Sequence, residues 1–383
     1  MRRTLVRTLT GVAVAAVLIG TAACAPSDKS GDNDAASGTC TYKIAMMGPI
    51  TGDNAGLGKP ILQAVQLAVE QHKAKNADKC VELVQSDDKG TEDAAPGLAQ
   101  QLVADQKVLG VVGPAFSGPT SASGDIFQAG NLPIISASAT RPDLADRGWT
   151  VFHRTLGNDA SQGPAVAKFI KDSLKATKVF VIDDKSDYGT GLAEQATAGL
   201  GSAVIGSESI QQKQTDFSAV VAKVKTAAPD AIFFAGYYAE GGPLAAQLKS
   251  AGVDAQFIGP DGIKDQGFIT GAADAAEGSI ITCPCIPAEK ATGTFAADYK
   301  AKFGEEAGTY AAEAFDAANV FLAGVTSGVT DRAKMLEFIT AYDQPGVSKH
   351  IKFDDKGEID KSVIVIWTYD VKGGAIVARE PIQ

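Results

Sequence analysis

Small hydroxyl residues follow two apolar stretches in the middle of the chain. The apolar residues 111–112 lead into a segment that carries Ser117 and Thr120, and residues 132–135 lead into the sequence Ser-Ala-Ser-Ala-Thr at 136–140. Where such a loop opens a helix, unpaired backbone N–H groups and the helix dipole favour an anion. Ordinary capping of strand-to-helix turns would also use Ser and Thr. Two such loops after successive strands favour a site for a carboxylate or a phosphate group.

Other residues that could do chemistry lack the spacing that their chemistry needs. The segment 52–59 looks like a nucleotide phosphate loop, but Gly52 lies six residues before Gly58, and Pro60 replaces the metal-binding hydroxyl. Three histidines are scattered without metal-ligand spacing: His72, His153 and His350. The sequence contains no Gly-x-Ser-x-Gly motif. It therefore predicts no catalytic residue, no metal site, no cofactor and no enzymatic activity.

Four of the five cysteines form two candidate pairs. Cys40 and Cys80 immediately precede the first two expected strands, and adjacent parallel strands start side by side, so the two sulfur atoms could meet. Outside the cytosol a disulfide is the default for such a pair. Cys283 and Cys285, separated by one proline, leave two possibilities open, which are a small-ring disulfide and two free thiols.

The fifth cysteine, Cys24, ends an N-terminal segment that resembles a bacterial lipoprotein signal. The positively charged residues of this segment are Arg2, Arg3 and Arg7. The apolar run 11–19 is too short to cross a bilayer, which takes ~20 residues. We therefore expect residues 1–23 to be a signal peptide and Cys24 to be lipidated after cleavage. The paired arginines leave twin-arginine export as an alternative.

Residues 24–39 are rich in Ser, Asp, Ala and Gly and are expected to form a flexible tether. The 383-residue chain is 45% hydrophobic and has a net charge of −10. Cleavage after residue 23 removes three of its 35 basic residues and none of its 45 acids, which leaves 32 against 45 and a net charge of −13. The absence of a basic patch excludes nucleic acid as a partner. The sequence predicts an extracytoplasmic domain that a lipid anchor attaches to the cell membrane.

Strands and helices must alternate to position these residues. The expected strands are 44–47, 81–84, 108–112, 179–182, 231–235 and 256–258. The expected helices are 94–105, 163–174, 189–200, 217–227 and 243–250, together with one that has Pro60 in its first turn. This alternation predicts an α/β fold with parallel sheets, and there are too many strands for one core. Two lobes are expected, with a ligand at the carboxyl ends of their strands. Three strands end in Gly-Pro and would face one cleft, at 48–49, 113–114 and 259–260.

Several short segments between Tyr42 and Tyr369 carry a more specific pattern. They are GPITG at 48–52, DIF at 125–127, RTLGND at 154–159, QGP at 162–164, DK at 184–185, YG at 188–189, GY at 236–237 and GPDG at 259–262. In these segments the chain resembles the leucine/isoleucine/valine-binding proteins, the type I solute-binding proteins of ABC importers. The resemblance implies a type I periplasmic-binding-protein fold, with two Rossmann-like lobes joined by three hinge crossings. The crossings would lie near Asn158, Cys285 and Lys361. The N-terminal lobe would comprise residues 40–158 and 286–361, and the C-terminal lobe residues 159–285 and 362–383.

The resemblance also implies which residues hold the two charged groups of an amino acid. Ser117 would donate its hydroxyl to the carboxylate, Ser138 would contribute backbone contacts, and Thr140 would use both its backbone and its side chain. Asp261 would receive the ammonium group, although the family commonly has a longer glutamate there. The residue types agree, because a zwitterion needs an anion site and a carboxylate at opposite ends of a short span.

The remaining positions of the resemblance concern the side-chain pocket and its closure. Tyr188 and Tyr237 would close over the ligand from the other lobe, since their rigid rings cover apolar surface at low entropy cost. Leu57 stands where well-known relatives have a tryptophan, and Phe116 replaces a cysteine of the family disulfide. Leucine is smaller than tryptophan, so the pocket should have extra apolar volume unless Phe116 moves in.

The leading hypothesis is a lipid-anchored substrate-binding protein with a branched-chain or similar amino acid as its ligand. Leucine, isoleucine or phenylalanine are expected to bind better than alanine, with valine intermediate. Its partners would be the permease and ATPase subunits of an ABC importer, and the protein itself would be a monomer. One alternative is a ligand-sensing module for a signalling receptor, because the same fold serves both roles. A binder of another small amino-acid-like or amide solute is a further alternative.

Overall fold

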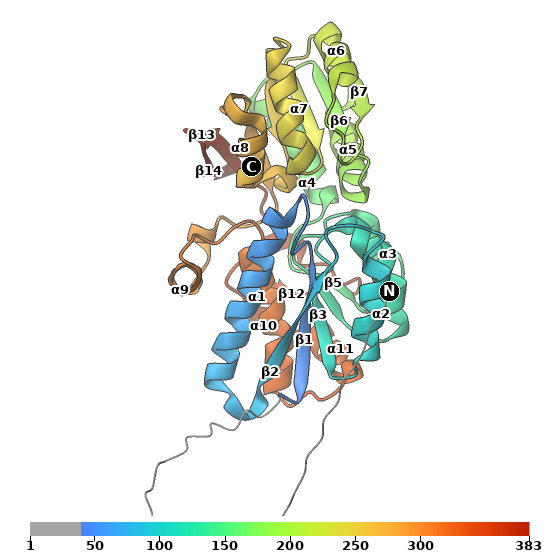
Figure 1. Ribbon diagram of the computed structural model, residues 1–383, viewed down its shortest axis with the longest axis vertical. Helices are drawn as coiled ribbons and strands as arrows, with labels where there is room; N and C mark the ends of the chain where they lie inside the picture. Colours follow the sequence, from blue (N-terminus) through green and yellow to red (C-terminus); the bar gives the residue numbers. More distant parts are fainter. Residues whose placement is uncertain (1–39, 383) are drawn as a thin grey trace, which may run out of the picture. The chain divides into compact units, whose positions relative to one another are not determined.

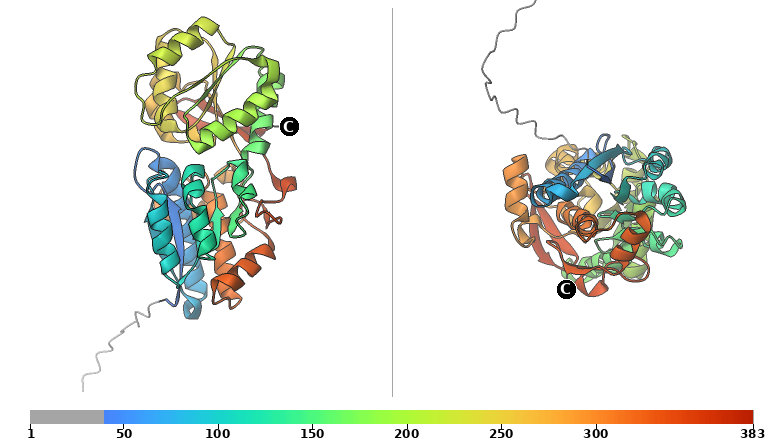
Figure 2. Two further views of the ribbon diagram at one scale, coloured as in Figure 1. Left: turned by 90° about the vertical axis from the view of Figure 1, so that its right-hand side faces the viewer. Right: turned by 90° about the horizontal axis from the view of Figure 1, so that it is seen from below.

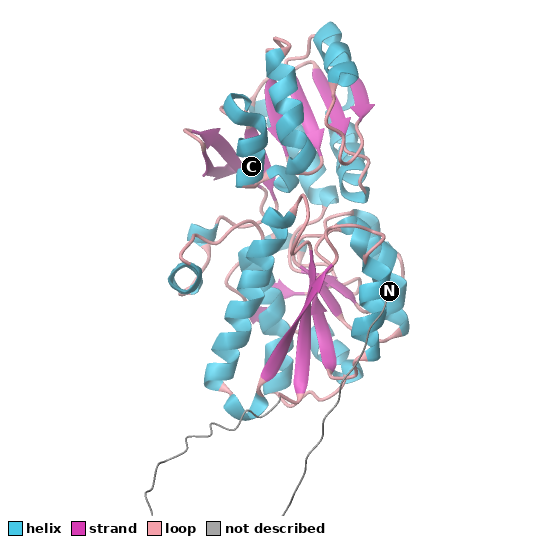
Figure 3. Cartoon of the chain, viewed as in Figure 1, coloured by secondary structure: helices cyan, strands magenta, loops and turns pink. Residues whose placement is uncertain are grey.

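Two large β-sheets organise the part of the chain that the structure describes. The structure is a computed structural model, and it describes residues 40–382. The expected signal peptide, the lipidation site Cys24 and the tether lie outside the described residues. The strands form a five-stranded sheet, a seven-stranded sheet and a two-stranded ribbon of β11 (Asp343–Pro345) and β12 (His350–Lys352) (Figure 3). The prediction of an α/β fold with parallel-rich sheets is confirmed.

The first sheet is parallel throughout and runs in the order β2-β1-β3-β4-β5. Its strands are β1 (Tyr42–Gly48), β2 (Val81–Asp87), β3 (Val108–Val112), β4 (Ile134–Ser136) and β5 (Phe152–Arg154). Helices on one face are α1 (Ala55–Lys75) and α10 (Ala311–Thr326), and those associated with the other face are α2 (Ala95–Ala104) and α3 (Ser117–Ala129) (Figure 1). In β1, Ile44 and Met46 pack into one hydrophobic cluster, and Ala45 and Met47 into the other. This alternation buries both faces of the sheet.

The second sheet runs in the order β14-β13-β10-β9-β8-β6-β7. Its parallel strands are β6 (Val179–Asp183), β7 (Val204–Ser209), β8 (Ala231–Ala235), β9 (Gln256–Gly259) and β10 (Ile280–Cys283). The antiparallel strands β13 (Trp367–Lys372) and β14 (Ala375–Pro381) complete one edge. They are joined at Gly373 and Gly374, whose φ angles of 59° and 75° suit a tight hairpin turn. The helices of this part are α4 (Asp159–Lys168), α5 (Asp187–Leu200), α6 (Ser218–Ala227), α7 (Tyr238–Ser250) and α8 (Gln266–Ala272).

Within residues 40–382 the chain passes between the two large sheets three times. It leaves the first sheet after β5, returns after β10, and enters the second sheet again at β13. The segment between the last two passages contains α9 (Phe295–Phe303), α10 and α11 (Arg332–Thr340), which contact elements of the first sheet layer. Early and late parts of the sequence therefore lie side by side, as with blue α1 and orange α10 in Figure 2.

Three helices begin a full turn or more before the residues that the sequence indicated, and each of them contains a proline. Pro60, Pro164 and Pro243 each stand at the sixth residue of a helix, in α1, α4 and α7. The expectation that Pro60 lies in the first turn was therefore wrong. A proline at this position leaves only the carbonyl of the second helical residue without its usual partner, so the helix continues past it. A π-helical turn at Phe169–Ser173 extends α4.

Two disulfides lie in the described residues. Cys40 is joined to Cys80, next to the point where Tyr42 of β1 pairs with Val81 of β2. Cys283 is joined to Cys285, directly at the end of β10. No helix in residues 40–382 is both long and apolar enough to cross a membrane.

Candidate functional site

The hydroxyl residues of the first sheet layer lie in two buried loops, after β3 and after β4, that are joined by hydrogen bonds. Ser136 Oγ donates to the carbonyl of Pro114 (2.7 Å) and accepts from Ala139 N (3.0 Å). Ser138 Oγ donates to the carbonyl of Ala115 (2.6 Å). These contacts join the loop after β4 to the loop after β3, so the hydroxyl of Ser138 already has a structural partner.

Two of the predicted hydroxyl residues can still form hydrogen bonds with a ligand. Ser117 is the first residue of α3 and is 1% exposed, and its Oγ accepts a long hydrogen bond from Arg141 N (3.3 Å). Thr140 is fully buried, and its Oγ1 has no hydrogen-bond partner among the described residues. A helix N-terminus and a free hydroxyl next to it favour a negatively charged group.

Asp261 lies just after β9, at the carboxyl edge of the second sheet, and is fully buried. Its Oδ1 accepts from Tyr188 Oη (2.9 Å) and Gln162 Nε2 (2.7 Å), and its Oδ2 accepts from Tyr310 Oη (2.5 Å). Burial raises the pKa of Asp261, and the three donors counteract this rise. The carboxylate predicted from the sequence is therefore held by donors on both of its oxygens.

Asp159 is a second buried carboxylate of the site, and sequence reasoning gave it no role. It is the first residue of α4 and is fully buried, and neither carboxylate oxygen has a hydrogen-bond partner among residues 40–382. Burial, and then the charge of Asp261, raise the pKa of Asp159 well above its usual value. The hydroxyl of Thr140 lowers this pKa but does not reach hydrogen-bond geometry, while Asp159 N donates to the carbonyl of Thr140 (2.9 Å). A carboxylate in this situation favours a cation.

Aromatic rings from both sheets cover these polar groups. Tyr188 and Tyr237 have ring centroids 5.2 Å apart, and Tyr237 stacks on Phe116 at 4.4 Å. Burial is the main cause that raises the pKa of both tyrosines well above 10. Phe116 directly precedes α3, whereas Tyr237 directly precedes α7, so this stack joins the first sheet to the second. A cavity of about 420 Å³ borders the stack, and its lining includes Lys185 and Lys213.

Leu57 is fully buried in α1 and belongs to the same hydrophobic cluster as Phe116, Tyr188 and Tyr237. The neighbouring Gly56 N donates to Tyr238 Oη (3.0 Å), which brings the start of α1 beside the start of α7. The structure thus gathers the predicted residues other than Leu57 around two adjoining groups, one with hydroxyls and one with carboxylates. We refer to Ser117, Ser138, Thr140, Asp159, Tyr188, Tyr237, Asp261 and Tyr310 together as the intersheet site.

Two members of the intersheet site carried little signal in the sequence. The pair Asn158-Asp159 reads as an ordinary helix start, and Asn158 indeed accepts a hydrogen bond from Ala160 N (3.1 Å). Tyr310 directly precedes α10 and has a φ of 66°. A positive φ is uncommon for tyrosine and could not be predicted from its residue type. Within the described residues, no group of three or more His, Cys, Asp or Glu side chains is arranged to hold a metal ion.

Two parallel-rich sheets, three passages between them and a buried polar site at their strand ends define a two-lobed solute-binding protein. The chain belongs to the periplasmic binding protein family, whose profile matches residues 41–365, and within it to the type I leucine/isoleucine/valine-binding proteins. This is a family of binding proteins and not of enzymes.

Comparison with individual proteins supports the family assignment. The leucine-, isoleucine-, valine-, threonine-, and alanine-binding protein of Pseudomonas aeruginosa is 33% identical over 328 residues, which cover 83% of this chain and 87% of that protein. The Leu/Ile/Val-binding protein of Escherichia coli is 29% identical over 346 residues, 88% of this chain and 93% of that protein. The crystal structure of the binding protein LivJ from Streptococcus pneumoniae in complex with isoleucine has a TM-score of 0.83 and 27% identity, and the match covers 89% of this chain and 99% of that one.

Proposed function

We propose that this chain is an extracytoplasmic substrate-binding protein that captures an amino acid with a branched apolar side chain and delivers it to an ABC importer. The observation that carries the proposal is the opposite polarity of the two halves of the intersheet site. Thr140 and the start of α3 favour an anion, whereas Asp159 and Asp261 favour a cation. An α-amino acid carries both charges a short distance apart. The names of the relatives above support the same class of ligand.

Each group of the site receives a role in this proposal. Ser117 and Thr140 hold the carboxylate, with backbone groups near Ser138, and Asp159 joins Asp261 in receiving the ammonium group. Tyr188 and Tyr237 cover the ligand from the second sheet, and Leu57 borders its side chain. We place the lobe boundaries at 158/159, 285/286 and 361/362, so that the ligand lies between lobes of residues 40–158 with 286–361 and 159–285 with 362–383.

Thermal unfolding with each of the common amino acids in turn tests the proposed ligand class. A ligand that binds only the native state raises the melting temperature, by mass action. We expect the largest rise with leucine or isoleucine, a smaller one with valine, and none with aspartate or lysine. Titration calorimetry of the best ligand then gives its affinity. A rise with no amino acid would refute the proposal.

We further propose that Cys24 carries a lipid that holds the protein at the cell membrane, where permease and ATPase subunits act. Small residues before Cys24 and the polar segment 24–39 after it support this arrangement. Mass spectrometry of the membrane-extracted N-terminal peptide should find a diacylglyceryl group on Cys24, and Cys24→Ala should release the protein from membranes. A membrane-bound Cys24→Ala protein would contradict the anchor.

A further inference from the structure

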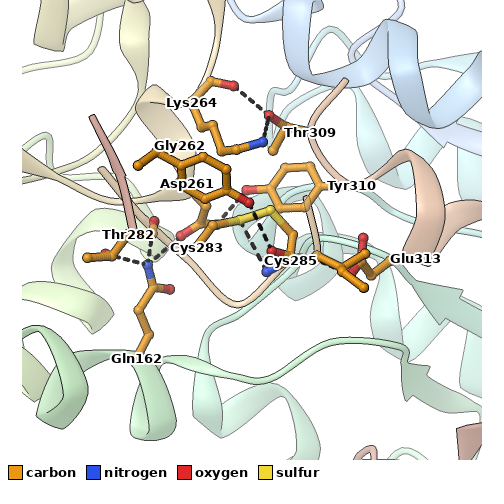
Figure 4. The surroundings of a disulfide bond; sticks show 12 residues. Gln162, Asp261, Gly262, Lys264, Thr282, Cys283, Cys285, Thr309, Tyr310 and Glu313 are labelled. Carbon is orange, nitrogen blue, oxygen red and sulfur yellow. Dashed lines mark hydrogen bonds between the residues drawn. A yellow bond between two sulfur atoms is a disulfide. The ribbon is translucent and has the colours of Figure 1, made fainter. Parts of the chain in front are cut away.

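The Cys283–Cys285 disulfide lies beside Asp261 of the intersheet site (Figure 4). Cys283 is the last residue of β10, and both cysteines are fully buried. The parallel register pairs Ile281 of β10 with Gly259 of β9. Asp261 comes two residues after Gly259, as Cys283 comes two residues after Ile281, and Figure 4 shows the two residues next to each other.

A short chain of hydrogen bonds connects the residue before the disulfide to Asp261. Gln162 Nε2 donates to the carbonyl of Thr282 (3.2 Å) and to Thr282 Oγ1 (3.1 Å). The same nitrogen donates to Asp261 Oδ1 (2.7 Å). Figure 4 shows Gln162 directed at both residues, with the disulfide next to them. The direction of the Thr282 carbonyl therefore helps to fix where Gln162 holds Asp261.

The other end of the disulfide is tied to two further elements. Tyr369 Oη of β13 donates to the carbonyl of Cys285 (3.3 Å), and Ile286 N donates to Glu313 Oε1 of α10 (3.0 Å). Cys285 N also donates to the sulfur of Cys283 (3.2 Å). The disulfide thus closes the turn by which the chain leaves the second sheet.

A disulfide between residues so close in sequence has little effect on the unfolded chain. In the chain-entropy account the stabilisation grows with the length of the closed loop, and here the sequence separation is 2, against 40 for Cys40–Cys80. Its main effect is therefore local: it restricts the backbone of the turn and with it the carbonyl of Thr282.

We propose that the Cys283–Cys285 disulfide is a positioning element that sets ligand affinity by holding Asp261 in place through Thr282 and Gln162. This inference rests on the proposed function, because one of its readouts is the affinity for an amino acid. It assigns to the disulfide a role in the site that differs from general stabilisation of the fold.

The experiment compares two double variants, with L-leucine as the probe. Cys283→Ser/Cys285→Ser removes the disulfide of the site, and Cys40→Ser/Cys80→Ser removes the distant one as a matched control. Three quantities are measured: the melting temperature, the affinity for L-leucine by calorimetry, and the NMR signals of the Gln162 side-chain amide. The amide signals report the position of Gln162 in the protein without any ligand.

We expect the site variant to lose affinity and the control variant to lose thermal stability. The site variant should lose about tenfold in affinity, as for one weakened hydrogen bond to a charged group, and shift the Gln162 signals while its melting temperature changes little. The control should melt at a lower temperature with unchanged affinity and unchanged Gln162 signals. An unchanged affinity together with unchanged Gln162 signals in the site variant would overturn the inference.

A second site variant and the ligand-free measurement keep the test decisive. Cys283→Ala/Cys285→Ala removes the bond without placing new hydroxyls in the buried turn, and it should behave like the serine pair if that pair fails to fold. If the parent protein does not bind L-leucine, affinity for this probe gives no readout, but the Gln162 signals still decide on the disulfide. Normal signals in a folded alanine variant would refute the positioning role.

Discussion

Asp159 and Asp261 are both fully buried, but their surroundings give them different roles. Asp261 accepts hydrogen bonds from two tyrosine hydroxyls and one amide, so its charge is already stabilised within the folded protein. Asp159 has no hydrogen-bond partner among the described residues and lies close enough for the charge of Asp261 to raise its pKa. A buried carboxylate without partners destabilises the fold, and a cationic ligand would relieve this.

Replacing each aspartate by asparagine should therefore give opposite effects on stability. Asp159→Asn should leave the unliganded protein as stable as the parent or more stable, whereas Asp261→Asn should cost roughly 2 kcal/mol because an amide nitrogen would face donors. Both should weaken binding of the best amino acid at least about a hundredfold, or ~3 kcal/mol. Urea unfolding and calorimetry measure the two effects. Near-normal affinity of Asp159→Asn would remove this residue from the site.

Asp88 gives the protein a dependence of stability on pH. It is buried, and only one of its oxygens is bonded, by Gly90 N (2.8 Å). Burial raises its pKa from 3.8 to about 7. Between these values the folded state binds more protons than the unfolded state, so this group lowers the stability as the pH rises. Asp88→Asn should abolish this contribution and stabilise the protein by up to about 4 kcal/mol at pH 8, but not at pH 4.

The neighbouring Asp87 provides the control for this prediction. Burial tends to raise its pKa, but hydrogen bonds from Thr51, Lys89 and Ile50 hold the pKa below its usual value. Its contribution to stability is present above the unfolded-state pKa and is lost as the pH falls through the folded-state pKa. Asp87→Asn should therefore destabilise the protein at pH 8. Urea unfolding at pH 4 and pH 8 measures the change in unfolding free energy for both variants. Equal changes for Asp87→Asn and Asp88→Asn would contradict the opposite pKa shifts of these two residues.

At the scale of elements, the sequence predicted the strands with clear apolar runs, including the edge strand β2. It did not predict β7, β13 and β14 at the edges of the second sheet, nor the short buried strands β5 and β10. A run such as Ile-Phe-Phe in β8 is apolar on both faces, because helices cover both sides of a parallel strand. In β7 partly buried and exposed residues alternate, and in β14 most residues are exposed, so neither has a continuous apolar run. Tyr310 and Asp159 could not be found in the same way, since their roles depend on residues far away in sequence.

The start of the first sheet depends on a covalent link between two of its elements. Cys40 and Cys80 close a loop with a sequence separation of 40, which contains β1 and α1. The chain-entropy account gives a stabilisation of roughly 3–4 kcal/mol for a loop of this length. Cys40→Ser/Cys80→Ser should lower the unfolding free energy by about this amount. Peptide mapping of exported protein checks the pairing, and two free thiols there would refute it.

For the whole molecule, the contact between Phe116 and Tyr237 connects the layers of the two sheets. Because a ligand shifts a conformational balance only through contacts that differ between the states, Tyr237 should couple binding to closure. We expect Tyr237→Ala to weaken binding and to reduce the ligand-induced decrease in radius of gyration seen by small-angle X-ray scattering. Tyr342→Ala, which removes a partly buried tyrosine outside the site, is the control. A Tyr237→Ala protein that compacts fully would show that this ring does not close the site.

The three passages of the chain between its sheets also determine when each sheet can be completed during synthesis. The first sheet needs α10, which is made only after the first five strands of the second sheet, and β10 needs its neighbour β13 from beyond residue 366. Neither half can finish folding from an N-terminal fragment alone. Contacts between such distant segments slow folding. The emerging chain therefore cannot complete either sheet layer until its last strands are available.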